Sequence, residues 1–263
     1  MIIMFEYYYD KLRFSQELSN SNILSLINLI ENKRNYFDIY IKNKDIHCHK
    51  GCNLCCHVLD LKMDIINAFI LLRIFETIPY KELYPYFKLC VDNRIKAQEY
   101  IDSLSTDCNK NTVEEVYNKL GFTDSTCPFV DKQNGCLIYK FRPNICFEYV
   151  SSYPCKFSFN QEEGISGLKN DKKMYRVEYN TLENNDISDE LLIEIYRELY
   201  RKLHKKDPIF QKNKMYNYFN TLYDIFDIVS TALEVSDPEK YKNDMEGINC
   251  GYDIFRNFYI NKN

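Results

Sequence analysis

Two short stretches of the chain contain eight of its eleven cysteines. The first cysteine block reads C-H-K-G-C-N-L-C-C and contributes Cys48, Cys52, Cys55 and Cys56. The second cysteine block contributes Cys127, Cys136, Cys146 and Cys155. Thiolates crowded into a poorly solvated site repel one another, and a bound metal removes that cost by coordinating the anionic sulfur. The two blocks therefore predict a metal site that holds zinc or an iron–sulfur cluster.

Disulfides are the main alternative use of so many cysteines. Cys55 and Cys56 are adjacent, and a bridge between neighbouring residues would close a strained small ring. The first residues, M-I-I-M-F-E, lack the basic and long apolar regions of a signal peptide. We therefore expect a cytoplasmic protein, in a compartment that keeps thiols reduced and available to a metal.

The spacing within the first cysteine block limits its geometry. On a straight helix Cys48 and Cys56 would lie roughly 12 Å apart, too far for one metal with bonds of about 2.3 Å to sulfur. The segment must fold back, and Gly51 supplies a residue suited to the bend. Cys52 and Cys55 then have the spacing of a metal knuckle, with Cys48 and Cys56 as ligands of the same or a second centre. Eight cysteines could hold two ions, one cluster with spare thiols, or a cluster and an ion. We interpret the bordering His47, His49 and His57 as neighbours of the site rather than ligands.

The second cysteine block contains strong turn signals. Asn134-Gly135 predicts a small hairpin in which Phe129-Val130 and Leu137–Tyr139 bring Cys127 and Cys136 near each other. Arg142 precedes a proline, which favours an extended backbone at that position. Its guanidinium is permanently charged, so Arg142 is a candidate for balancing the charge of the thiolates. An ordinary surface arginine is the alternative reading.

These residues carry a family resemblance over about residues 46–156. The run from Cys48 through G-C-x-x-C-C-H, followed by C-P-F at Cys127 and C-x-I-Y-x-x-R-P-x-x-C at Cys136, resembles the zinc- or iron-chelating CxxCxxCC proteins. This YkgJ-like family includes the flagellin lysine N-methylases. The first gap here holds three residues where the family name has two, and Phe147 stands where an arginine often follows the cysteine. The resemblance implies a bound metal, with zinc and iron–sulfur both open.

Two classes of function are consistent with this pattern. The first is a metal-binding protein whose site is structural, stores metal or passes electrons. The alternative is an enzyme that resembles the flagellin N-methylases and transfers a methyl group from S-adenosylmethionine to a lysine of a protein substrate. A thiol–disulfide oxidoreductase is disfavoured, because its C-x-x-C motif is expected within an α/β pattern. The residues do not decide whether the protein is an enzyme.

Composition excludes several other classes. A formal net charge of −4 disfavours a general nucleic-acid binder, which needs a basic surface. Only seven glycines occur, and none forms a G-x-G-x-x-G or P-loop motif. The most apolar run, at residues 68–72, is too short to span a membrane. We therefore expect neither nucleic acid nor membrane as a partner, while a protein partner or substrate stays open.

The remaining sequence predicts a mainly α protein: a helical domain around a loop-borne, cysteine-rich metal site, with at most a small β-hairpin. We divide it into an N-terminal helical segment at 1–45, a metal-binding core at 46–156 and a helical region at 157–263, all within one structural domain. Apolar spacing and capping residues predict six helices and one short strand. The helices are expected at 21–42 after Ser21, from Asp60 to Glu76, from Pro79 to Leu104, at 112–120, from Ser188 to Lys205 and at 209–234; the strand is expected at 174–179.

Overall fold

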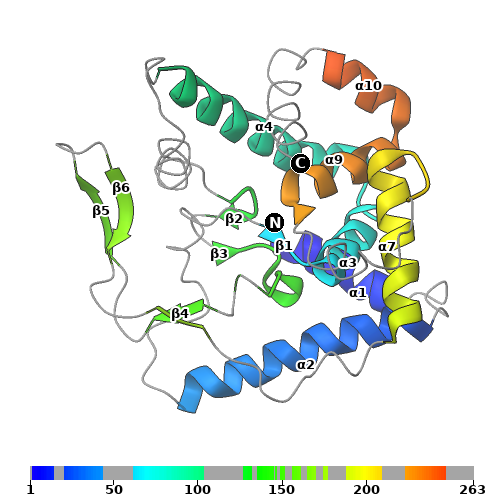
Figure 1. The fold of residues 1–263 in the computed structure, drawn as a ribbon, viewed down its shortest axis with the longest axis horizontal. Helices are drawn as coiled ribbons and strands as arrows, with labels where there is room; N and C mark the ends of the chain where they lie inside the picture. The colour runs from blue at the N-terminus through cyan, green and yellow to red at the C-terminus, as the bar shows by residue number, and fades with distance from the viewer. Residues whose placement is uncertain are drawn as a thin grey trace.

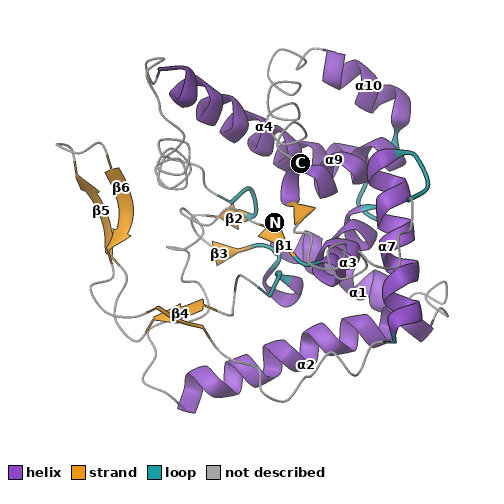
Figure 2. Ribbon diagram, in the orientation of Figure 1, coloured by secondary structure: helices purple, strands orange, loops and turns teal. Residues whose placement is uncertain are grey.

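The structure, a computed structural model, contains seven α-helices in the part of the chain that it describes (Figures 1 and 2). The described residues are 2–14, 21–43, 62–103, 127–131, 135–144, 146, 149–151, 156–160, 165–169, 174–176, 188–208 and 223–246. The helices are α1 (Ile2–Phe14), α2 (Ser21–Asn43), α3 (Ile65–Phe75), α4 (Tyr80–Ser103), α7 (Asp189–His204), α9 (Ile225–Ser236) and α10 (Pro238–Glu246). The predicted mainly α fold class is confirmed.

The strands are short and form four antiparallel pairs within the described residues. The predicted hairpin exists as β2 (Val130–Asp131) with β3 (Gly135–Cys136). Its second strand ends earlier than expected, because Tyr139–Phe141 forms a 3₁₀ turn, η3. The other pairs are β1 (Lys62–Met63) with β8 (Tyr223–Asp224), β4 (Tyr149–Ser151) with β7 (Met174–Arg176), and β5 (Lys156–Asn160) with β6 (Ile165–Lys169). Strand content thus exceeds the single hairpin predicted, and β7 lies where the sequence predicted a short strand.

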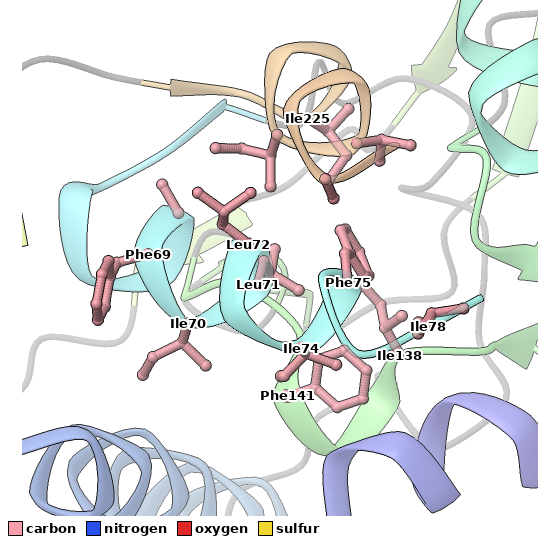
Figure 3. Close-up of a cluster of buried hydrophobic side chains, with 14 of the residues drawn as sticks. Phe69, Ile70, Leu71, Leu72, Ile74, Phe75, Ile78, Ile138, Phe141 and Ile225 are labelled. Carbon is pink, nitrogen blue, oxygen red and sulfur yellow. The ribbon is translucent and has the colours of Figure 1, made fainter. Parts of the chain in front are cut away.

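Helix α3 lies at the centre of the hydrophobic core. All of its residues are buried except Ile66 and Arg73, so this helix is apolar nearly all round. Figure 3 shows its side chains extending both towards Ile225 of α9 and towards Phe141 of η3. Burying each large side chain contributes roughly 1.5–3 kcal/mol, so these contacts provide much of the packing free energy. Residues from all three sequence segments belong to this one core.

Helices α3 and α9 start side by side from the β1–β8 pair, in which Lys62 faces Asp224 and Met63 faces Tyr223. An aspartate caps each helix: Asp64 accepts from the backbone N–H groups of α3, and Asp224 accepts from that of Phe226 at 2.7 Å. The predicted cap at Asp60 is therefore wrong, because strand pairing occupies Lys62 and Met63 and delays the helix. Asp60 itself lies outside the described residues.

Other helix boundaries agree with the predicted ones where the capping residue lies within one turn of the helix end. Helix α7 begins after Ser188, whose side chain accepts from Leu191 N at 3.3 Å, and ends at Lys205, which has a left-handed φ of 55°. Helices α2 and α4 match their predicted ranges within two residues. A continuous helix over 209–234 is wrong, because Tyr223–Asp224 forms β8 and α9 begins at Ile225. The helix expected at 112–120 lies outside the described residues.

Two helices were not predicted. Helix α1 places Phe5, Tyr9 and Leu12 in the core. Helix α10 contributes no buried residue and attaches through Tyr80 of α4, whose hydroxyl donates to Asp244 at 2.7 Å. None of the helices that the structure describes is both long and apolar enough to cross a membrane.

Candidate metal centre

The described part of the chain contains three of the eight predicted ligands: Cys127, Cys136 and Cys146. All three are present as thiols, are half-buried and pack against the margin of the core. The other predicted ligands lie outside the described residues, as do the three bordering histidines: Cys48, Cys52, Cys55, Cys56 and Cys155, with His47, His49 and His57.

Cys136 lies in the β2–β3 hairpin, and Cys127 lies just before its first strand. Val130 pairs with Cys136 across the ladder, and the N–H of Val130 also donates to the carbonyl of Cys127 at 3.1 Å. The N–H of Leu137 donates to the carbonyl of Phe129 at 2.9 Å and extends the pairing. Gly135 has φ of 76°, a left-handed value that glycine adopts without steric cost. The Asn134-Gly135 turn signal therefore correctly located a hairpin, with Cys136 in its second strand and Cys127 three residues before its first strand.

Two tight turns then lead from Cys136 to Cys146. Phe141 N–H donates to the carbonyl of Ile138 at 3.0 Å, which closes η3, and Cys146 N–H donates to the carbonyl of Pro143 at 2.9 Å. We call the described residues 127–131, 135–144 and 146 the cysteine turn segment. Its backbone is held by local hydrogen bonds immediately beside each of its three cysteines.

Aromatic side chains fix this segment to three helices. Phe129 is fully buried, and its ring centroid lies 5.5 Å from that of Phe5 in α1, 5.3 Å from Phe75 in α3 and 5.4 Å from Tyr86 in α4. Such offset and edge-to-face contacts add stability beyond that of burial alone. Phe129, two positions after Cys127, therefore anchors the start of the hairpin in the core.

A second aromatic contact anchors η3. The ring of Phe141 stacks on that of Tyr9 in α1, with centroids 5.1 Å apart. Phe141 and Ile138 also point towards α3 in Figure 3. The turns between Cys136 and Cys146 are thus packed on the same core as the hairpin.

Polar contacts add further anchors along the segment. Arg34 of α2 donates from Nη1 to the carbonyl oxygen of Lys140 at 2.5 Å. The Nζ of Lys140 lies 3.4 Å from an Asp10 carboxylate oxygen and 3.8 Å from one of Glu6, both in α1. These contacts tie the turn before Cys146 to α1 and α2.

Arg142 projects from the segment onto aromatic rings. Its Cζ lies 4.2 Å from the ring centroid of Tyr139 and 5.7 Å from that of Phe37 in α2. Both distances fall within the range of a cation–π contact. The two rings therefore hold the guanidinium of Arg142 in place. Arg142 lies between Cys136 and Cys146 in the sequence, and its role in balancing thiolate charge stays a prediction.

The charges around Tyr139 describe the local field. Burial raises the pKa of Tyr139; Arg142 opposes that shift, Asp38 adds to it, Arg34 opposes it and Cys136 adds to it. The net effect is a raised pKa, so the phenol is protonated at neutral pH. Two guanidiniums, one carboxylate and one thiol thus act on the same hydroxyl.

The chemistry of the donors suits a soft or borderline metal, since thiolates select zinc and iron–sulfur clusters. Among the described residues, no group of three or more cysteine, histidine or carboxylate side chains is arranged to hold a metal ion. The structure therefore does not gather Cys127, Cys136 and Cys146 into one such group within the part of the chain that it describes. The sequence did not single out the polar residues that support this segment, because isolated polar residues carry no motif. They are Arg34, which donates to Lys140, and Asp64, which accepts from Asn144.

Comparison of the chain with protein-family models, with curated proteins and with solved structures gives no match in any of the three. The resemblance to the CxxCxxCC family stays a prediction from the cysteine pattern.

Proposed function

We propose that the protein binds a metal through cysteine thiolates, as zinc or as an iron–sulfur cluster. The observation that carries the proposal is the cysteine turn segment, in which three thiols occupy a backbone anchored by Phe129, Phe141 and Arg34. A segment that is ordered before binding loses less conformational entropy when a ligand binds.

The ligands in this proposal come from both cysteine blocks. Cys127, Cys136 and Cys146 supply part of the set. The remainder comes from Cys52 and Cys55, which have the spacing of a metal knuckle, from the flanking Cys48 and Cys56, and from Cys155. A complete set of four thiolates per centre would cross-link the fold, store the metal or pass electrons. Arg142 would offset part of the negative charge of the loaded centre.

Metal and sulfide analysis of protein purified without oxygen tests the proposal directly. Iron with inorganic sulfide and a broad visible absorption would identify a cluster, whereas stoichiometric zinc in a colourless protein would identify a zinc site. Folded, reduced protein that binds neither metal would contradict the proposal. Binding of S-adenosylmethionine by the iron-loaded form would instead favour the methyl-transfer alternative.

A matched pair of variants assigns the ligands. Cys136→Ser should reduce the metal content, because serine does not replace a thiolate ligand for these metals. Cys90→Ser is the control, since Cys90 is buried in α4 and belongs to neither cysteine block. Equal metal content in the two variants would remove Cys136 from the ligand set.

A thiolate centre of this kind is suited to the reducing cytoplasm, where we place the protein. We also propose that it acts without nucleic acid, given its net charge of −4. Cell fractionation and a salt-dependent DNA-binding assay test these two points.

A further inference from the structure

We propose that Arg34 and Arg142 act together as a cationic pair at the cysteine turn segment, with Arg34 a positioning and charge-balancing residue of the metal centre. This inference rests on the proposed metal-binding function. It adds a residue from α2, outside both cysteine blocks, to the group of residues that would support the metal.

The first argument is the position of the two guanidiniums. Arg34 reaches the segment from α2 and donates to the carbonyl of Lys140, the middle residue of η3. Arg142 immediately follows η3 and lies over the Tyr139 ring at 4.2 Å. Two arginines from separate elements therefore meet at one turn, the turn that follows Cys136.

The second argument is the balance of charge. The pKa of Tyr139 is shifted by four neighbouring groups: Arg142, Arg34, Asp38 and Cys136. All four therefore interact electrostatically with its hydroxyl. With Cys136 ionised by a metal, two cations would face one thiolate and one carboxylate. Such a neighbourhood would favour the anionic form of the ligand, because nearby opposite charges stabilise an ionised group.

The third argument is that Arg34 also sets the shape of the turn. Its bond to a backbone carbonyl is directional and charge-assisted, so loss of the side chain would loosen η3 as well as remove a charge. Groups that orient metal ligands from outside the coordination sphere typically contribute 10–100-fold in metal affinity. We therefore expect Arg34→Gln to weaken metal binding about tenfold.

The experiment measures Zn²⁺ affinity by competition with a chromophoric chelator, under anaerobic reducing conditions. The wild-type protein is titrated first, and no Zn²⁺ binding there would contradict the zinc form of the proposed function rather than the role of Arg34. Next come Arg34→Gln, Arg34→Lys and the control Arg13→Gln. Arg13 of α1 is the matched arginine. It forms an ion pair with Glu31 of α2, the helix that also contains Arg34, and not with the cysteine turn segment.

The expected result is about tenfold weaker Zn²⁺ binding in Arg34→Gln, substantial rescue in Arg34→Lys, and wild-type affinity in Arg13→Gln. Thermal unfolding of each metal-free variant separates this effect from a loss of fold. Wild-type affinity in folded Arg34→Gln would overturn the inference, as would an Arg34→Lys affinity as weak as that of Arg34→Gln.

If Arg34→Gln does not fold, Arg142→Gln provides the test of the cationic pair. That change leaves the hydrogen bond from Arg34 to Lys140 in place and removes only the second guanidinium. A comparable loss of Zn²⁺ affinity that diminishes at high salt supports the pair, since salt screens charge. An unchanged affinity overturns it.

Discussion

Asn144 donates a hydrogen bond from Nδ2 to the Asp64 carboxylate, at 3.4 Å from Oδ2. The same carboxylate caps α3, accepting through Oδ1 from the N–H groups of Ile66 at 3.0 Å and Asn67 at 2.9 Å. Its Oδ2 also accepts from Nδ2 of Asn67 at 2.5 Å. One aspartate thus joins the start of the central helix to the turn just before Cys146.

Replacing Asp64 with alanine should destabilise the protein by about 2–4 kcal/mol. Loss of an N-cap costs about 1 kcal/mol, and the buried amides of Asn67 and Asn144 would lose their acceptor, at about 1–3 kcal/mol. Urea unfolding measures the change. Ser188→Ala removes the exposed cap of α7 and should cost only about 1 kcal/mol. Equal losses in the two variants would contradict a linking role for Asp64.

Phe129→Ala should be among the most destabilising substitutions in the segment, at about 3–5 kcal/mol. Phe129 is fully buried, and its ring contacts Phe5, Phe75 and Tyr86, so truncation would leave a cavity between three helices. The free energy of unfolding in urea provides the measurement. Leu89→Ala serves as the control, because Leu89 is 46% exposed and should change stability by less than about 0.5 kcal/mol.

The contact between α1 and α2 predicts a dependence of stability on pH. Burial by itself would raise the pKa of Glu31, but hydrogen bonds from Arg13 and Tyr9 and the charges of Arg13 and Arg34 lower it overall. The Tyr9 hydroxyl donates to the Glu31 carboxylate at 2.5 Å. A carboxyl with a lower pKa in the folded state stabilises the fold above its unfolded pKa, and this contribution is lost as pH falls through the folded pKa.

Glu31→Gln should therefore cost roughly 1–3 kcal/mol near neutral pH, where the charged hydrogen bonds are intact. The difference between the variant and the wild type should shrink as pH falls below the ordinary carboxyl pKa of about 4.5. Denaturant unfolding across this pH range measures the difference. A gap that stays constant down to low pH would show that ionisation of Glu31 does not stabilise the fold.

The structure also predicts an order of thiol reactivity in metal-free, reduced protein. Cys90 is only 5% exposed within α4, whereas Cys127, Cys136 and Cys146 are half-buried at the margin of the core. Alkylation followed by peptide mass spectrometry should label the three segment cysteines at least about tenfold faster than Cys90, because a reagent reaches a buried thiol only after local unfolding. Added Zn²⁺ should protect the segment cysteines and leave Cys90 unchanged. Equal rates at all four would contradict the packing of α4.

Local signals in the sequence predicted the elements whose ends depend on nearby residues. Ser188 and Lys205 bound α7 as expected, because capping involves groups within one turn. The turn signal at Gly135 likewise located the β2–β3 hairpin, whose second strand contains Cys136. The identity of the candidate ligands follows from spacing alone, and their roles as ligands stay predictions.

The contacts that support these cysteines depend on residues distant in sequence. Lys62 pairs with Asp224, and with this pairing the cap of α3 is Asp64 in place of the expected Asp60, and α9 begins at Ile225 after a strand. Nothing local to Asp60 or Asp64 distinguishes them as caps, since either carboxylate can accept from a helix N-terminus. Tertiary structure selects between them.

The sequence by itself determined a mainly α chain with eight clustered cysteines, because helical periodicity, caps and ligand spacing are all local properties. Only the tertiary structure decided that Arg34 meets Lys140, that Asn144 meets Asp64, and that Phe129 lies among rings from three helices. Such contacts form where the core closes, and they depend on packing between segments that no local pattern encodes.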